Sequence, residues 1–217
     1  MIMRIVGVVS LLTVLISVAS CGSQDGFELR NGDLIFQVGN VSAMTSAISE
    51  ATVRDSALSL THVGIVAMDG DVAYVVEASP RGGVVRSTVR SFLESSGSIE
   101  GRPAAVVMRL KEPFDDKMAV RRALEHLGEP YDWAYRHCNG QMYCSELVYD
   151  SYLDSNGYPL FPAQPMNFRN ADGTMPQFWT DLFSRLGEPI PEGEPGTNPN
   201  DMARSTLLQT VHRYYLK

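Results

Sequence analysis

The chain has 217 residues, of which 44% are hydrophobic and 20% charged. These values are typical of a globular domain and unlike those of a disordered tail or a multispanning membrane protein, and the length suits one domain with a single core. The formal charge is -7 at pH 7 and no Lys- or Arg-rich stripe is visible. Nothing in the sequence therefore supports a nucleic-acid partner.

The first predicted element is an export signal over residues 1–20. A single positive charge at Arg4 precedes an apolar run from Ile5 to Val18. A transmembrane anchor is the alternative, but this run is shorter than the roughly 20 residues that a membrane-spanning helix needs. The segment ends in four residues that resemble the bacterial lipobox, Val18-Ala19-Ser20-Cys21.

In a lipobox the cysteine thiol is acylated and the chain is cut just before it, so we expect a mature chain that starts at a lipidated Cys21. Residues 21–27 then form a tether to one catalytic domain over residues 28–217. The residue after the cysteine is Gly22 and not Asp, which by the Gram-negative sorting rule favours the outer membrane. We expect a lipid-anchored protein of the cell envelope that faces the periplasm.

The domain opens with a turn and a buried strand at residues 32–37, followed by a short helix or structured loop at 40–52. Two β-rich runs, 62–68 and 72–78, flank Asp69-Gly70, a strong signal for a two-residue hairpin turn. With Asp69 and Gly70 as the central turn residues, His62 falls directly opposite Glu77. Their Cβ atoms would then lie about 5 Å apart on one face. A carboxylate in that position orients an imidazole and favours its protonated form.

The rest of the chain alternates short strands and helices. Together with the hairpin these elements predict an α+β domain with a mostly antiparallel sheet. The Pro- and Gly-rich stretch 188–199 is interpreted as a surface loop that returns the last strand to the sheet. The remaining strands are predicted at 83–86, 104–110 and 207–216, and the remaining helices at 88–95, 114–127, 143–153 and 175–186.

Cys144 lies in the first turn of the helix predicted at 143–153. Unpaired backbone N–H groups at a helix start stabilise a thiolate and can also stabilise an oxyanion. Cys144 and His62 are thus candidates for nucleophile and base. Purely structural roles are the alternatives: Cys144 as a small core residue, His62 bonded to backbone, and Glu77 as a solvated strand residue.

Two further interpretations concern Cys138. A disulfide between Cys138 and Cys144 would mask the proposed nucleophile, although the short spacing restricts its geometry. The neighbouring pair His137 and Cys138 hints at a metal, but no second close pair of ligands is visible. We therefore expect neither a metal nor a cofactor.

Four motifs together resemble the permuted NlpC/P60 superfamily of papain-like cysteine hydrolases, and within it the YiiX/YebB-like group. In ordinary members the cysteine helix comes first, whereas here the strands precede it. The resemblance implies a circularly permuted papain-like fold with a Cys–His–polar site formed by Cys144, His62 and Glu77. The motifs are Gly32-Asp33-Leu34-Ile35-Phe36, Thr61-His62-Val63-Gly64-Ile65-Val66, Val76-Glu77-Ala78 and Tyr143-Cys144-Ser145-Glu146-Leu147-Val148.

The resemblance also suggests Tyr143 and Tyr131 as pocket residues. Ordinary members cut amide bonds in peptidoglycan stem peptides, while permuted members include acyltransferases and lipid-acting enzymes, so the substrate does not follow from the fold. The leading hypothesis is a cysteine amidase or peptidase that cleaves peptidoglycan stem peptides or related γ-glutamyl peptides through an acyl-enzyme on Cys144. A lipid-directed acyl hydrolase or acyltransferase and a non-catalytic binding module are the alternatives.

Overall fold

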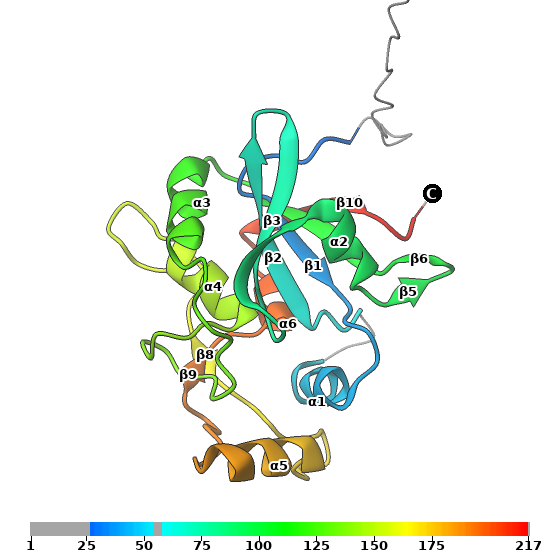
Figure 1. Ribbon diagram of the computed structural model, residues 1–217, viewed down its shortest axis with the longest axis vertical. Coiled ribbons are helices and arrows are strands. Elements are labelled where there is room, and N and C mark those ends of the chain that lie inside the picture. The colour runs from blue at the N-terminus through cyan, green and yellow to red at the C-terminus, as the bar shows by residue number, and fades with distance from the viewer. Residues whose placement is uncertain (1–26, 54–57, 217) are drawn as a thin grey trace, which may run out of the picture.

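The computed structural model in Figure 1 describes residues 27–53 and 58–216. The predicted signal, the lipidated Cys21 and all of the tether except Phe27 lie outside these residues. Within them, no helix is both long enough and apolar enough to cross a membrane.

An antiparallel sheet of six strands forms the centre of the fold, in the order β10-β7-β1-β2-β3-β4 (Figure 1). Each predicted strand is present, and the α+β prediction is confirmed. The strands are β1 (Leu34–Gln37), β2 (His62–Asp69), β3 (Val72–Ser79), β4 (Gly83–Thr88), β7 (Ala105–Leu110) and β10 (Leu208–Arg213).

Helices pack on both faces of this sheet because its strands alternate apolar side chains between two cores. Leu34 and Phe36 enter one core, together with residues of α3 and α4, whereas Ile35 enters the other, which Phe92 of α2 caps. α1 and α5 contact each other at one end of the molecule (Figure 1). The helices are α1 (Ala43–Thr52), α2 (Val89–Glu94), α3 (Asp116–Glu125), α4 (Cys144–Ser151) and α5 (Gln177–Leu186).

The β2–β3 hairpin forms with a register that differs from the prediction. Asp69 pairs with Val72, so the turn residues are Gly70 and Asp71 instead of Asp69 and Gly70. The prediction that His62 directly faces Glu77 is therefore wrong. The shift moves every partner by two positions, and because side chains alternate with period two it keeps His62 and Glu77 on the same face.

The segment predicted as a surface loop at 188–199 is structured at its end. Gly196 and Pro199 are buried, β9 (Pro195–Gly196) pairs with β8 (Gln164–Pro165), and α6 (Pro199–Ala203) follows. Buried Asn200 accepts a hydrogen bond from the Leu60 N–H at 2.8 Å. This segment thus secures the chain just before β2. A small hairpin of β5 (Ser98–Ile99) and β6 (Arg102–Pro103) was also not predicted.

Candidate active site

Cys144 is the first residue of α4 and carries a free thiol. Tyr143 before it is extended, with φ -99° and ψ 165°, so the helix begins abruptly at the cysteine. The side chain of Glu146 accepts a hydrogen bond from the Tyr143 N–H at 3.3 Å, which satisfies one of the unpaired donors at this end. Cys144 is buried, with 6% of its surface exposed. Cys144 therefore combines a core position with the electropositive end of a helix.

His62, the first residue of β2, forms an ion-pair contact with Glu77 of β3. Its Nε2 lies 2.7 Å from Glu77 Oε2, and both side chains are largely buried. The second carboxylate oxygen, Oε1, accepts a hydrogen bond from the Ser87 hydroxyl of β4 at 2.6 Å. Glu77 is thus held from both sides. Ser87 was not predicted, although its place on the strand beside Glu77 offered the signal.

Gly64 explains how a diagonal pair of residues can touch. Continuing the observed register, Gly64 faces Glu77, so no side chain stands between Glu77 and His62. A Cβ at Gly64 would lie 2.3 Å from Val75 Cγ1 and 3.1 Å from a ring carbon of Phe92. The Phe92 ring in turn stacks on the His62 ring at 5.6 Å between centroids. Because Gly64 has no side chain, Phe92 can pack against the His62 imidazole and fix the plane of that ring.

The charges of the three residues reinforce one another. Burial alone would lower the pKa of His62, but hydrogen bonding and charge from Cys144 and Glu77 outweigh it and raise that pKa to about 10. Burial would raise the pKa of Glu77, yet the contacts with His62 and Ser87 lower it overall. At neutral pH the site therefore holds an imidazolium paired with a carboxylate.

Cys138 does not share this environment. Its thiol is free and exposed, so the alternative of a Cys138–Cys144 disulfide is not realised. The neighbouring His137 instead bonds to Glu146 at 3.3 Å, and that contact raises the pKa of the imidazole. The described residues contain no group of three or more His, Cys, Asp or Glu side chains that could hold a metal ion.

A small hollow of about 60 Å³ adjoins Cys144, and both predicted tyrosines, Tyr131 and Tyr143, line it. The Tyr143 hydroxyl is engaged, because it accepts the Thr197 N–H at 3.1 Å and lies 3.3 Å from His137 Nε2. Sequence reasoning missed Tyr135 and Trp179 in the same wall. They come from separate parts of the chain that meet only in the fold.

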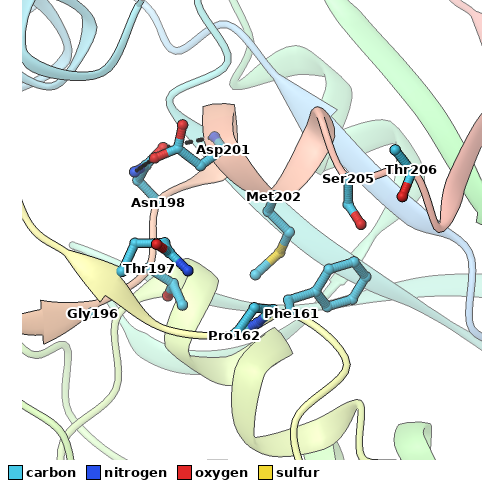
Figure 2. A pocket seen from close by; sticks show the side chains of 10 residues that line it. Phe161, Pro162, Gly196, Thr197, Asn198, Asp201, Met202, Ser205 and Thr206 are labelled. Carbon is cyan, nitrogen blue, oxygen red and sulfur yellow. Dashed lines mark hydrogen bonds between the residues drawn. The ribbon is translucent and has the colours of Figure 1, made fainter.

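A larger cavity of about 280 Å³ is lined in part by the segment 196–198 (Figure 2). It shares Thr197 and Asn198 with the hollow beside the thiol but does not contain Cys144. Figure 2 shows Phe161, Pro162 and Met202 around it. The chemistry therefore centres on the smaller hollow.

A cysteine at the start of a helix, packed on an antiparallel sheet whose strand β2 carries the histidine and precedes the cysteine in sequence, defines a permuted papain-like cysteine hydrolase fold. A model of the permuted papain-like amidase family YaeF/YiiX, the C92 family, matches residues 28–212. The chain belongs to that family.

Two relatives agree with this assignment. The protein named "Uncharacterized protein YiiX" of Escherichia coli strain K12 is 28% identical over 206 residues, which cover 93% of each chain. The crystal structure of a protein described as metalloprotein yiiX, from Escherichia coli O157:H7, is 25% identical and superposes with a TM-score of 0.71. That match covers 88% of this chain and all of the other.

Proposed function

We propose that this protein is a thiol amidohydrolase of the bacterial cell envelope in which Cys144 is the nucleophile, His62 the acid and base, and Glu77 the residue that orients His62. The observation that carries the proposal is the 2.7 Å contact of His62 Nε2 with the buried carboxylate of Glu77. Cys144 at the start of α4 interacts with the same imidazole and helps to raise its pKa. A nucleophile, a base and a group that orients the base form the arrangement that covalent catalysis requires.

In the first step the Cys144 thiolate attacks the carbonyl carbon of the amide. The carbonyl electrons move onto oxygen, and the N–H groups at the start of α4 stabilise the resulting negative charge. When the C–N bond breaks, the His62 imidazolium donates its proton to the leaving amine. The acyl group remains on the sulfur as a thioester.

In the second step water attacks the thioester carbonyl and His62 takes up the water proton. The C–S bond then breaks, which releases the carboxylic acid and returns the electron pair to the Cys144 sulfur. Acylation helps His62 change from acid to base, because the charge of the Cys144 sulfur is one of the causes that raise the pKa of His62. Once the sulfur carries an acyl group that contribution disappears, and the neutral imidazole becomes easier to form. The site thus favours the acid before acylation and the base after it.

The E. coli O157:H7 relative is described as a metalloprotein, but the side chains of this site do not fit a metal centre. His62 Nε2 and both Glu77 oxygens are engaged in contacts within the site, and no suitable ligand group exists among the described residues. No step proposed here passes through a metal.

The predicted lipobox supports a location at the outer membrane, with Cys21 as the lipid anchor and the domain facing the periplasm. There, peptidoglycan stem peptides and γ-glutamyl peptides are the first substrates to test. Release of fragments by the wild-type protein but not by Cys144→Ala would support this substrate class, and equal release by both would refute it. The hollow beside Cys144 has an aromatic wall and no charged lining residue, which favours a second class, amides of apolar acyl groups.

The decisive experiment traps the acyl-enzyme. After brief exposure to an activated acyl ester, mass spectrometry of the digested protein should find the acyl group on the peptide that contains Cys144. Cys138→Ala serves as the matched control and should be labelled equally, because it removes an exposed free thiol and keeps Cys144. Labelling of Cys138 alone would contradict the proposal and favour a binding module. Transfer of the acyl group to an added amine or lipid instead of water would identify an acyltransferase.

The rate of acylation should depend on pH through His62. Since its pKa is raised to about 10, the imidazolium persists from neutral pH upward and the rate should fall only as the pH passes about 10. The interactions of the His62 imidazolium with Cys144 and Glu77 also stabilise the fold. Their contribution to stability is fully present below pH 6.5 and is lost as the pH rises through about 10. In Glu77→Gln the alkaline limit should move down toward 6.5, because the carboxylate no longer supports the charge.

Rates of Cys144 acylation measured between pH 6 and 11 test this prediction. Ser87→Ala is the control, since it removes one hydrogen bond to Glu77 but keeps the carboxylate, and its alkaline limit should move less. An unchanged limit in Glu77→Gln would show that Glu77 does not act on His62.

A further inference from the structure

Among the described residues, no acidic or basic side chain lines the hollow beside Cys144. Within the part of the chain that the structure describes, none of its lining residues is Asp, Glu, Lys, Arg or His. They come from α1, Thr61 just before β2, the segment after Pro130, the start of α4, the segments 166–168 and 197–199, and α5. Any part of a substrate that enters this hollow meets only neutral groups.

Aromatic rings form one wall of the hollow. Tyr135, Phe168 and Trp179 pack edge to face, with centroids 5.0 to 6.0 Å apart. All three are buried, Trp179 with only 2% of its surface exposed. Met166 and Ile48 add aliphatic surface. Such walls bind apolar groups through loss of water and dispersion contacts.

Charged residues that neighbour this wall in sequence are engaged with other groups. Arg169, which follows Phe168, donates to the Gly173 carbonyl at 3.1 Å and lies 3.9 Å from Glu192. Buried Asp132 accepts hydrogen bonds from the N–H groups of Ala134 and Arg136, at 2.8 and 2.6 Å, which shape the turn that carries Tyr135. The Arg136 guanidinium is paired with Glu188 and Glu194. No cation is left in the wall to pair with a substrate carboxylate, and burying an unpaired carboxylate is costly.

Two polar groups in the wall lack a well-formed hydrogen bond among the described residues. Trp179 Nε1 and the Tyr135 hydroxyl are buried without a hydrogen bond of good geometry among residues 27–53 and 58–216, although Tyr135 adjoins the Tyr131 hydroxyl. An indole N–H can only donate. Unpaired buried donors are uncommon in folded proteins and often mark a place where a ligand or water binds. Both donors suit a neutral oxygen acceptor.

The size of the hollow limits what it can take. Its volume is about 60 Å³, and one water needs roughly 10–15 Å³ by a comparable measure, so it has room for on the order of four to six water-sized groups. That corresponds to a short aliphatic chain or a single ring.

We propose that the site selects amides whose acyl group is short, apolar and uncharged, and that it discriminates against acyl groups with a carboxylate, including the γ-glutamyl type. The inference rests on the proposed role of Cys144, because the acyl group is the part of the substrate that stays on the thiol lining this hollow through both steps. It separates the two substrate classes that the family resemblance leaves open.

Three amides of equal length test the proposal by binding alone: pentanamide, glutaramate and 4-aminobutanamide. They differ only at the far end, which is a methyl, a carboxylate or an ammonium group. The protein is the Cys144→Ala variant, which cannot turn them over. The indole N–H signal of Trp179 in nuclear magnetic resonance spectra reports binding. The second tryptophan, Trp133, does not line the hollow, and its signal should stay in place.

Pentanamide should bind at least tenfold more tightly than either charged amide and should shift the Trp179 signal. Equal or tighter binding of glutaramate would overturn the proposal, as would binding that leaves the Trp179 signal unmoved. This readout is independent of catalysis. If pentanamide is preferred but no acyl-enzyme forms in the trapping experiment, the proposed function is wrong and the specificity of the hollow is retained. If the acyl-enzyme forms but pentanamide is not preferred, the proposed specificity is wrong and the proposed function is retained.

A charge placed in the wall provides a matched test. Met166 lines the hollow and is half-buried, so Met166→Lys keeps a long side chain and adds a cation. We expect it to raise the affinity for glutaramate at least tenfold and to leave that for 4-aminobutanamide no higher. Met166→Gln, which is neutral, should retain the wild-type order. An unaltered order in Met166→Lys would contradict the placement of the acyl group.

Discussion

Replacement of Cys144 by alanine should lower the rate of amide hydrolysis by roughly 10⁴–10⁶-fold, the range expected when a nucleophile that works as a unit with its base is removed. The physical reason is that Cys144 is the thiol that acts on His62, whereas Cys138, the second free cysteine of the described residues, is exposed. The substitution removes one sulfur from a helix start that keeps its other contacts, and alanine is a good helix former. The loss should therefore appear in kcat with little change in folding.

Single-turnover hydrolysis of a neutral acyl anilide, with thermal melting measured in parallel, checks this prediction. Cys138→Ala is the control that also removes a thiol, and it should retain the wild-type rate. Comparable rates in Cys144→Ala and the wild type would exclude Cys144 as the nucleophile, whatever the cause of the activity. A loss of folding in Cys144→Ala would instead be visible in the melting curve.

Replacement of Gly83 by alanine should destabilise the fold by about 3 kcal/mol or more, a large effect for a single methyl group. Gly83 begins β4 with φ +67°, and a Cβ there would lie 2.0 Å from the backbone oxygen of Glu129. Neither backbone can yield easily, because Val84 N–H donates to that same oxygen and Gly128 N–H donates to Val84 O. The contact also sets the position of Tyr131, two residues after Glu129.

Gly70→Ala separates the two causes. Gly70 also has positive φ, +58°, but a Cβ there would meet nothing within 4 Å. Its cost should be only the roughly 1–2 kcal/mol of a left-handed conformation. Denaturant midpoints with unchanged m-values measure both variants. Equal losses would show that the close approach of β4 to Glu129 contributes nothing.

The β2–β3 hairpin shows which structural features the local sequence pattern can predict. The β-rich runs around Asp69 and Gly70 correctly predicted two strands, and alternation of side chains was enough to place His62 and Glu77 on one face. The turn itself formed one residue later, at Gly70 and Asp71. The pairing survived because the register moved by two positions, and because Gly64 leaves the diagonal between the two side chains open.

The pocket lay beyond the reach of local pattern. Tyr131 and Tyr143 were predicted by resemblance, but Tyr135, Phe168 and Trp179 were not, because no spacing in the sequence links them. The stretch 188–199 looked like a surface loop because Pro and Gly dominate it. In the fold its end pairs with β8 and lines the hollow.

The sequence by itself determined the strands, the helix that begins at Cys144, and the motif order that identifies the permuted fold. These depend on periodicity and turn residues, which act over a few positions. Only the tertiary structure decided that the Cys144 thiol interacts with His62 and that Phe92 stacks on His62 while Ser87 bonds to Glu77. It also decided that the lining of the hollow carries no acidic or basic side chain. Those features arise where segments distant in sequence pack together, and packing is set by the whole core.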